Sequence, residues 1–391
     1  MIKFVTKKLV TIALAAFLTL ALWLPAQASY FAVALRTETA AIVDGAHVVF
    51  LTYDIGGSRF IKLRDLAHSL SGSPKRFDVS WSGADNAIHI ETDRPYGAVG
   101  SEMSLDGAEA GTARLSNAKT LLDGNEVEIL AYTLGGASFY RLRDLGRILD
   151  ISVEWDGAIN AVIIDTGMES AQPADSSGSV VGIGRGVDPS KPMVALTFDD
   201  GPSPYTSQIL DILEQHGAVA TFFVVGNRVG WNSDIISRAY NMGSEIAGHS
   251  WSHRLLTNLQ ESDIRAEIQS TSSAIQSVTG VLPVFFRAPY GAVNNKVLSA
   301  AQGLGVPVVS WSVDPQDWMN RNSNTIYTRI MRSVKDKDII LCHDIYPSTV
   351  SAMKRVIPDL ISRGYQLVTV SELMYYSEKT PEAGGLYNHG R

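Results

Sequence analysis

The stretch MVALTFDDGP, residues 193–202, decides the fold of the C-terminal half of this chain. Six uncharged residues lead into two adjacent acids, and Gly-Pro then turns the chain, which is typical of a buried strand and its end. Similar strands then alternate with amphipathic helical patterns, so we expect an α/β fold, a distorted barrel of about seven parallel strands. The expected strands are residues 193–198, 220–225, 245–247, 284–287, 306–313, 338–342 and 365–370, and the clearest helices are residues 262–278 and 348–361.

Polar motifs follow the first and third expected strands, at the strand ends where the catalytic residues of such barrels lie. Asp199 and Asp200 end the first strand, although an acid before Gly-Pro is equally typical of a helix N-cap. His249 and His253 follow the third strand, and their spacing predicts one helical face that binds an ion together with Asp200. Two imidazoles and one carboxylate suit a zinc hydrolase and a non-haem iron oxygenase alike.

Three more motifs follow later strands: RAPYG at residues 287–291, DPQDW at residues 314–318 and LCHD at residues 341–344. The five motifs, in this order, resemble those of the NodB homology domain of polysaccharide deacetylases, carbohydrate esterase family 4. The resemblance covers about residues 193–374, close to half of the chain. It implies a metal-dependent hydrolase that acts on linear amide C–N bonds, a polysaccharide N-deacetylase.

The resemblance also implies how water is activated. Asp200, His249 and His253 would bind one divalent metal ion, for which zinc is the first expectation and cobalt or nickel are the alternatives. Asp199 would be the general base, paired with Arg287, and would take a proton from water whose pKa the ion lowers. An iron oxygenase has no use for such a base–arginine pair, so the hydrolase is the better interpretation.

Further residues receive roles by the same resemblance. His343 would be the general acid that protonates the leaving amine, with Asp317 orienting its ring. The backbone N–H of Tyr290 would stabilise the oxyanion. Trp318 and Leu341 would bind the substrate by shaping an apolar site for the acetyl methyl group.

The first 28 residues have the pattern of a secretory signal. Lys3, Lys7 and Lys8 precede an uncharged apolar run at residues 9–24, and Ala-Gln-Ala at residues 26–28 matches a cleavage site. The run is shorter than the roughly 20 residues that span a bilayer. We therefore expect a secreted protein, extracellular or associated with the cell wall, and membrane anchoring by an uncleaved signal is the alternative.

Residues 29–167 contain an internal repeat. The sequence LRDL at residues 63–66 returns at residues 142–145, 79 positions later, and the surrounding pattern predicts a duplicated α+β unit. It resembles the copper amine oxidase N-terminal-like, or stalk, domains of Gram-positive surface proteins, which implies a spacer or an attachment to the cell wall rather than copper chemistry. Residues 168–192 are rich in Gly, Ser and Pro and predict a flexible linker between two independently folding units.

Composition restricts the remaining function classes. Apolar residues make up 45% and charged residues 19% of the 391-residue chain, which favours globular domains. The net charge of −7 argues against nucleic acid as a partner, and the single cysteine, Cys342, excludes an intramolecular disulfide framework. We expect a deacetylase of N-acetylated glycans, foremost N-acetylglucosamine in peptidoglycan. A chitin or exopolysaccharide deacetylase, or a non-catalytic glycan-binding protein with this fold, are the alternatives.

Overall fold

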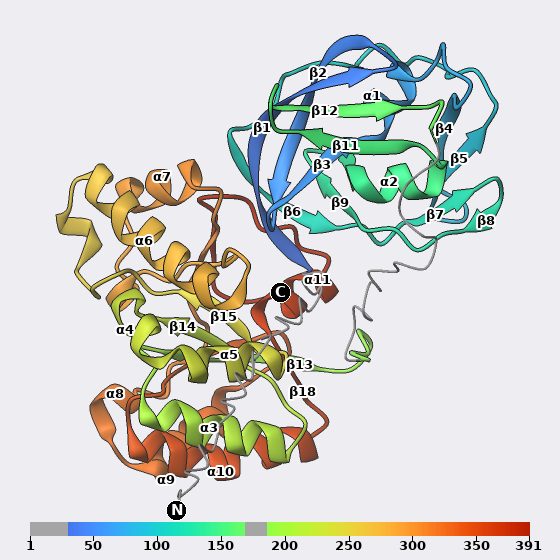
Figure 1. Cartoon of the computed structure of the whole chain (residues 1–391). Coiled ribbons are helices and arrows are strands. Elements are labelled where there is room, and N and C mark those ends of the chain that lie inside the picture. Colours follow the sequence, from blue (N-terminus) through green and yellow to red (C-terminus); the bar gives the residue numbers. More distant parts are fainter. Residues whose placement is uncertain (1–29, 169–185) are drawn as a thin grey trace, which may run out of the picture.

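The computed structural model describes residues 30–168 and 186–391. The predicted signal peptide at residues 1–28 and most of the predicted linker, residues 169–185, lie outside these ranges. In the described part, the helices all fall short of the length and apolar character that crossing a bilayer requires. Figure 1 shows two parts, one with most of its strands in blue to green and one with helices around a set of strands in green to red.

The C-terminal part is built on parallel strands, as the alternating pattern predicts. Strand β13 (Met193–Asp199) is central, with β17 (Ile339–His343) on one edge, β14 (Thr221–Val224) on the other and β15 (Glu245–Gly248) beyond it. All three pairings are parallel. The residues of β13 are all buried, which explains its uninterrupted apolar sequence.

Isolated parallel bridges close this sheet into a barrel. Gly248 of β15 pairs with Phe286, and Phe286 pairs with Val308 of the short strand β16 (Val308–Val309). Val313 then pairs with Ile340 of β17, which returns the ring to its start. The expectation of about seven strands in the ring is not confirmed. The last expected strand, β18 (Gln366–Val368), pairs with Met193–Ala195 of β13, and β14 pairs with Thr197–Asp199 on the same edge of β13. β18 therefore shares an edge with β14 and adds no separate position to the ring.

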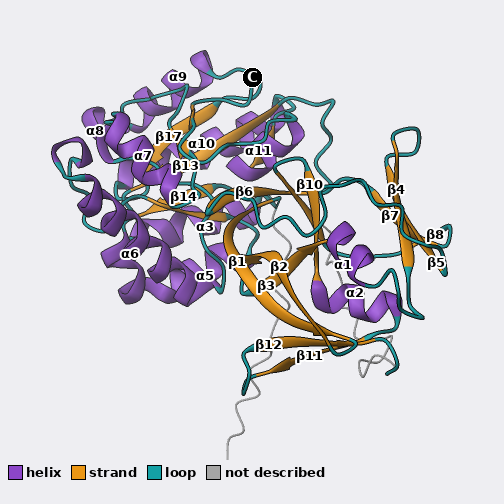
Figure 2. Cartoon of the chain, turned by 90° about the horizontal axis from the view of Figure 1, so that it is seen from above, coloured by secondary structure: helices purple, strands orange, loops and turns teal. Residues whose placement is uncertain are grey.

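Helices cover the outside of the barrel, as Figures 1 and 2 show. Phe198, Phe222, Ile209 and Met353 share one buried cluster, so the outer face of the strands packs against helical residues. The two helices predicted most clearly are present with nearly the expected bounds, as α6 and α10. The helices are α3 (Pro204–Gln215), α4 (Gly226–Val229), α5 (Ser233–Asn241), α6 (Glu261–Thr279), α7 (Asn295–Gly303), α8 (Asp317–Asn320), α9 (Ser323–Ser333), α10 (Pro347–Ser362) and α11 (Val370–Tyr376).

Alternation along β17 separates core residues from residues of the barrel interior. Ile340 and Cys342 belong to the cluster beneath the helices, and Cys342 is fully buried. Side chains alternate between the two faces of a strand, so Leu341 and His343 lie on the opposite, inward face. Burial raises the pKa of the Cys342 thiol, as expected of a small core residue rather than a nucleophile.

The N-terminal part consists of two sheets and two short helices. An eight-stranded sheet has the order β11-β12-β1-β2-β3-β10-β9-β6, and a four-stranded sheet has the order β4-β5-β7-β8, which Figure 2 shows on the side away from the barrel. Helices α1 (Leu63–Ser69) and α2 (Leu142–Leu149) begin at equivalent positions of the sequence repeat. The strands are β1 (Phe31–Val43), β2 (Ala46–Ile55), β3 (Ser58–Lys62), β4 (Phe77–Ser82), β5 (Ala87–Thr92), β6 (Ala110–Leu115), β7 (Lys119–Leu122), β8 (Asn125–Glu126), β9 (Ala131–Leu134), β10 (Ala137–Arg141), β11 (Ser152–Asp156) and β12 (Ala161–Asp165).

The two parts share a core at the start of β1, which Figure 1 shows reaching toward α11. Phe31 is fully buried in one cluster with Met193 and Phe285 of the barrel and Leu373 of α11. Met193 is the first residue of β13, so Phe31 fills the barrel at the end opposite the carboxyl ends of its strands. Independent folding of the two parts, which the sequence predicts, stays a prediction. In the structure the barrel takes one core residue from the N-terminal part.

Strand β6 adds polar contacts beside this core. The guanidinium of Arg114 lies 4.9 Å from the centre of the Tyr375 ring, and its Nη2 donates a hydrogen bond to the Tyr375 carbonyl over 3.4 Å. Thr112 Oγ1 donates to the carbonyl oxygen of Gly305 over 3.3 Å. Apolar, cation–π and hydrogen-bonding contacts therefore join the two parts along β1 and β6.

Candidate active site

The structure brings the predicted ligand side chains together. Nitrogen atoms of His249 and His253 and a carboxylate oxygen of Asp200 all lie within 4.8 Å of one another. Asp200 Oδ1 is 3.0 Å from His253 Nε2 and 3.4 Å from His249 Nε2. These residues follow β13 and β15, which are linked through β14 in the parallel sheet, so their carboxyl ends meet at one end of the barrel.

The two histidines do not lie on a helix, which corrects the expectation from their spacing. They belong to a loop after β15, in which Ser250 and His253 have positive φ angles of 63° and 56°. The Ser250 hydroxyl accepts a hydrogen bond from His253 N over 2.9 Å. Glu267 of α6 accepts two hydrogen bonds from the backbone and side chain of Ser252. Hydrogen bonds across this loop, rather than helical periodicity, therefore bring the imidazoles together.

The hydrogen bonds of these residues fit a bound cation. His249 Nδ1 lies 2.8 Å from the carbonyl of Arg287 and must donate its proton there, so Nε2 is the nitrogen that faces Asp200. Asp200 Oδ1 is buried and accepts no hydrogen bond from the described residues. Burial by itself would raise the pKa of Asp200, but the two imidazoles hold it far below its usual range. A divalent ion with open positions suits this donor set.

Asp199 points to the same place but is held by Arg287. Arg287 Nη1 donates to Asp199 Oδ1 over 2.6 Å, and the guanidinium is buried 3.9 Å from the centre of the Phe223 ring. It also donates to the Thr197 hydroxyl and to the carbonyl of Ser310. Asp199 Oδ2 is 3.8 Å from His249 Nε2. One carboxylate oxygen is therefore fixed by the arginine, while the other faces the ligand set.

His343 lies directly across from Asp199, because the two residues are paired in the register of β13 and β17. Its Nδ1 is 2.7 Å from Asp317 Oδ1, and its backbone N–H donates to Asp317 Oδ2. Asp317 is fully buried and also accepts a hydrogen bond from the Thr349 hydroxyl. Burial by itself would lower the pKa of His343, but the hydrogen bond and the charge of Asp317 outweigh it and raise that pKa to about 9. A cationic imidazole therefore faces the carboxylates.

The remaining predicted residues line the same end of the barrel. Tyr290 is largely exposed at the rim, and its ring centre is 4.7 Å from that of His253. Trp318 is 44% exposed in α8, next to Asp317. Leu341 is buried on the inward face of β17, two residues before His343. The exposed indole of Trp318 is thus adjacent in sequence to Asp317, and the inward side chain of Leu341 lies on the same strand as His343.

Asp344 supports the site, although sequence reasoning assigned it no role. It is fully buried, its backbone N–H donates to the Asp199 carbonyl, and its Oδ2 accepts a hydrogen bond from Thr206 of α3. A Cβ at Gly201 would lie 2.2 Å from Asp344 Oδ2, so only glycine fits there. Burial raises the pKa of Asp344 to about 7. In the sequence, its position directly after His343 in the LCHD motif is the feature that could have suggested this supporting role.

Arg228 and Glu267 were also missed. Arg228 Nη1 donates a hydrogen bond to the carbonyl oxygen of Asp200, whose φ angle is 75°. Glu267 holds the histidine loop from α6, where it is one of the buried residues. An acid among the buried positions of an amphipathic helix is a signal that the sequence did offer. Both residues position the ligand set through its backbone.

The family described as polysaccharide deacetylase matches residues 186–309. The peptidoglycan-N-acetylmuramic acid deacetylase PdaC of Bacillus subtilis is 43% identical over 188 residues, which cover 48% of this chain and 40% of that protein. The peptidoglycan-N-acetylglucosamine deacetylase of Bacillus cereus is 36% identical over 190 residues, which cover 47% of this chain and 89% of that protein. The solved structure of PdaC is 42% identical, with a TM-score of 0.48, and the match covers 49% of this chain and 94% of that one.

These matches differ in the fraction of each relative that they cover. The chain matches about 40% of the length of the Bacillus subtilis relative, and 39% of a peptidoglycan-N-acetylglucosamine deacetylase of Listeria monocytogenes. It covers nearly all of the Bacillus cereus protein. The profile match includes Asp199, Asp200, His249, His253 and Arg287. This chain belongs to the polysaccharide deacetylase family.

Proposed function

We propose that this protein is a secreted, metal-dependent polysaccharide deacetylase that hydrolyses the N-acetyl groups of amino sugars, foremost N-acetylglucosamine in peptidoglycan. This proposal rests on two ion pairs beside the three proposed metal ligands, one that holds a possible base and one that holds a possible acid. Asp199 is paired with Arg287 at 2.6 Å, and His343 is paired with Asp317 at 2.7 Å. A carboxylate held by a guanidinium and an imidazole kept protonated by a second carboxylate, side by side on neighbouring strands, are the base and the acid that amide hydrolysis needs.

A divalent ion held by Asp200, His249 and His253 would polarise the acetamide carbonyl and lower the pKa of water. We expect zinc, with cobalt or nickel as alternatives. Asp199 would accept the proton of the attacking water through the carboxylate oxygen that Arg287 leaves free. The ion pair with Arg287 fixes the orientation of the Asp199 carboxylate, so that its second oxygen faces the ligand set.

His343 would complete the reaction at the leaving nitrogen. Its Nδ1–H is engaged by Asp317, so the proton available for transfer is the one on Nε2. Protonation of the departing amine prevents its expulsion as a strongly basic anion. We further propose that the backbone N–H of Tyr290 donates to the developing oxyanion, and that Trp318 and Leu341 enclose the acetyl methyl group.

The hydrolysis of an acetamide does not by itself determine which polymer is the substrate. Peptidoglycan is the proposed substrate because the relatives from Bacillus and Listeria described above are named for it. Chitin oligomers are the second candidate, because a chitooligosaccharide deacetylase of Bradyrhizobium is 35% identical and is covered over 90% of its length. Both glycans carry the same acetamido group, so the base and acid described above serve either one.

The N-terminal part is proposed to act outside the chemical step. We propose that residues 29–167 are a duplicated α+β unit of the stalk type that attaches the enzyme to the cell wall, with residues 168–192 as a linker. The order of elements supports a duplication. In each copy a hairpin leads into a short helix, β2-β3 before α1 and β9-β10 before α2, and a second hairpin follows.

Acetate release tests the proposal. Purified protein is incubated with peptidoglycan, with chitin oligomers and with poly-N-acetylglucosamine, and acetate is measured enzymatically for each substrate. Peptidoglycan should release acetate fastest, and Asp200→Asn, which removes one ligand and keeps the side-chain shape, should abolish the release. Acetate release from chitin oligomers alone would select the second candidate. No release from any N-acetylated glycan by protein supplied with zinc or cobalt would refute the deacetylase function.

A further inference from the structure

A pocket of about 640 Å³ lies in the N-terminal part, where the two sheets meet. It is lined by residues of β3, β4, β5, α1, β9 and β10, together with segments around residues 99–104 and 116–118. Its volume is typical of sites that bind small ligands. The proposed catalytic residues, from Asp199 onward, are not among those that line it, so it is separate from the site described above.

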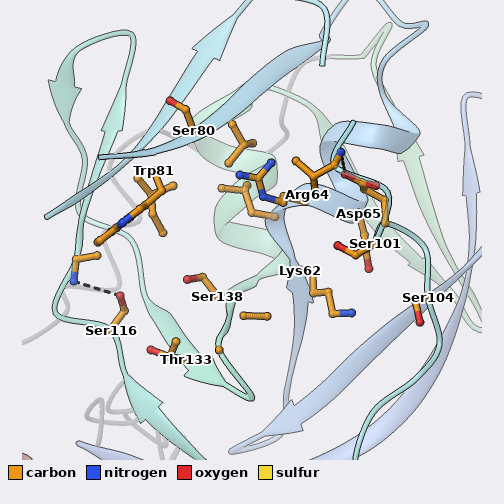
Figure 3. A pocket seen from close by; sticks show the side chains of 18 of the residues that line it. Lys62, Arg64, Asp65, Ser80, Trp81, Ser101, Ser104, Ser116, Thr133 and Ser138 are labelled. Atoms are coloured by element: carbon orange, nitrogen blue, oxygen red, sulfur yellow. Dashed lines mark hydrogen bonds between the residues drawn. The ribbon is translucent and has the colours of Figure 1, made fainter. Parts of the chain in front are cut away.

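One wall of the pocket presents an aromatic ring. Trp81 of β4 lines the pocket and remains 55% exposed, and Figure 3 shows it across the pocket from Arg64 and Asp65. An exposed indole beside a pocket offers a flat apolar face, against which the C–H face of a pyranose ring can pack. Hydroxyl groups also line the pocket, among them those of Ser138 and, on the side of Asp65, Ser101, and they can bond to sugar hydroxyls.

The opposite wall carries two cations that form no close ion pair with the described residues. Among the described residues, no carboxylate lies within ion-pair distance of Lys62 or Arg64, although both line the pocket. Arg64 makes one long hydrogen bond to the hydroxyl of Tyr96, at 3.4 Å. The nearby acid Glu102 is occupied by that same Tyr96 hydroxyl and by two backbone N–H groups. The wall is therefore prepared for an anionic group.

The same wall contains a buried acceptor without a donor. Asp65 is 1% exposed, and its Oδ1 accepts a hydrogen bond from Met103 N over 3.0 Å. Its Oδ2 is buried and has no hydrogen-bond partner within the described ranges. An unsatisfied buried oxygen is costly, and Asp65 is one of the residues that line the pocket. A hydroxyl or amide hydrogen of a bound ligand would satisfy this atom.

The second copy of the repeat shows what this arrangement replaces. There the residues equivalent to Lys62 and Asp65 are Arg141 and Asp144, and they bond to each other twice at 2.8 Å. In the first copy the corresponding acid accepts a hydrogen bond from the backbone of Met103 instead and forms no ion pair with Lys62. The two copies thus share a sequence pattern, but the cation of the second copy is paired with its acid and the cation of the first copy is not.

We propose that this pocket binds a short segment of glycan that carries a carboxylate. The indole of Trp81 packs against a pyranose ring, Lys62 and Arg64 bind the carboxylate, and a ligand hydroxyl or amide hydrogen donates to Asp65. Peptidoglycan contains such a group, so the proposal deepens the wall attachment suggested above and rests on that proposed function for its choice of polymer. The pocket then holds the strand while the barrel deacetylates it at another sugar.

Binding by the full chain tests the proposal. The background is Asp199→Asn, which prevents turnover, and the probe is a soluble peptidoglycan tetrasaccharide with free carboxylates, titrated by calorimetry. Trp81→Ala and Arg64→Gln should each weaken the binding attributable to the pocket by about tenfold or more. Trp155→Ala is the matched control, because Trp155 occupies the corresponding strand of the second copy, is 57% exposed and does not line the pocket. Equal affinities for Trp81→Ala and Trp155→Ala would overturn the proposal.

A second probe tests the acidic group, and an activity assay separates the two proposals. Chitotetraose, which has no carboxylate, should bind the pocket at least about tenfold more weakly, and equal binding would overturn the assignment of Lys62 and Arg64. In the background with Asp199 intact, Trp81→Ala should leave acetate release from small oligomers unchanged and should reduce co-sedimentation with insoluble peptidoglycan. Unchanged co-sedimentation in an active enzyme would refute the pocket alone, whereas absent acetate release would refute the deacetylase alone.

Discussion

Asp317→Asn should move the alkaline limit of activity, because Asp317 is what keeps His343 protonated. The hydrogen bond and charge of Asp317 raise the pKa of His343 to about 9, against the opposing effect of burial. A general acid acts only while protonated, so activity depending on His343 is present below this pKa and is lost as the pH rises through it. Asparagine keeps the shape and the hydrogen bonds from Thr349 and from the backbone of His343, but it removes the charge.

The size of the effect follows from the two protonation equilibria. With a pKa of about 9, roughly 90% of His343 is protonated at pH 8, whereas a return to the ordinary value of about 6.5 leaves roughly 3%. We therefore expect Asp317→Asn to lose about 30-fold in kcat/KM at pH 8 and less than about twofold at pH 6. A bound cation offsets the charge of Asp200, so the limit in the metal-loaded enzyme lies at or below 9.

The assay is the pH dependence of kcat/KM for acetate release from a soluble N-acetylglucosamine oligomer. The metal content is measured at each pH. The matched control is Asp314→Asn, which changes an exposed acid of the same DPQDW motif that accepts a hydrogen bond from the backbone N–H of Gln316. The control should keep the alkaline limit of the unaltered protein. An unchanged limit in Asp317→Asn, with the protein folded and loaded, would refute the role of Asp317 and the assignment of His343 as the acid.

Three further changes probe the site and one probes the fold. Dialysis against a strong chelator should abolish acetate release and zinc or cobalt should restore it, so full activity in metal-free protein would contradict the proposed ligand set. Asp199→Asn should keep its metal, because it leaves all three ligands, while losing on the order of 10²–10⁴ in rate; loss of metal measured by atomic absorption would mean that Asp199 is itself a ligand. His343→Ala should slow acetamide hydrolysis severely and nearly spare an activated aryl acetate, whose phenolate leaves without protonation, and equal losses would argue against an acid role. Phe31→Ala should destabilise the barrel by roughly 3–5 kcal/mol, as expected for a buried phenylalanine, and lower the midpoint of thermal unfolding. Trp155→Ala is the control variant. If the barrel of Phe31→Ala unfolds at the same midpoint as that of Trp155→Ala, the shared core contributes nothing to its stability.

Much of the proposed active site could be inferred from local sequence because of one property of parallel sheets. Their strands end at a common edge, so motifs that follow successive strands converge there whatever the loops do. Asp199, His249 and His343 are far apart in the chain, yet each follows or ends a strand whose apolar run was recognisable. The geometry of the histidine loop could not be inferred in this way. Its two positive φ angles occur in a loop whose backbone N–H groups donate hydrogen bonds to Ser250 Oγ and to Glu267, which a spacing of four residues does not reveal.

The sequence by itself determined the alternation of strands and helices in residues 193–391, the repeat in residues 29–167 and the set of residues that carry chemistry. Only the tertiary structure decided what each apolar face packs against. The pattern of β1 marks Phe31 as buried, but a hydrophobic residue is equally stable in any apolar surrounding, so nothing local assigns it to the barrel. The same holds for the pocket beside Trp81, where the repeat predicts two equal copies. Asp144 bonds to Arg141, three residues before it, whereas Asp65 accepts a hydrogen bond from the backbone of Met103, 38 residues later. That long-range contact makes the two copies different.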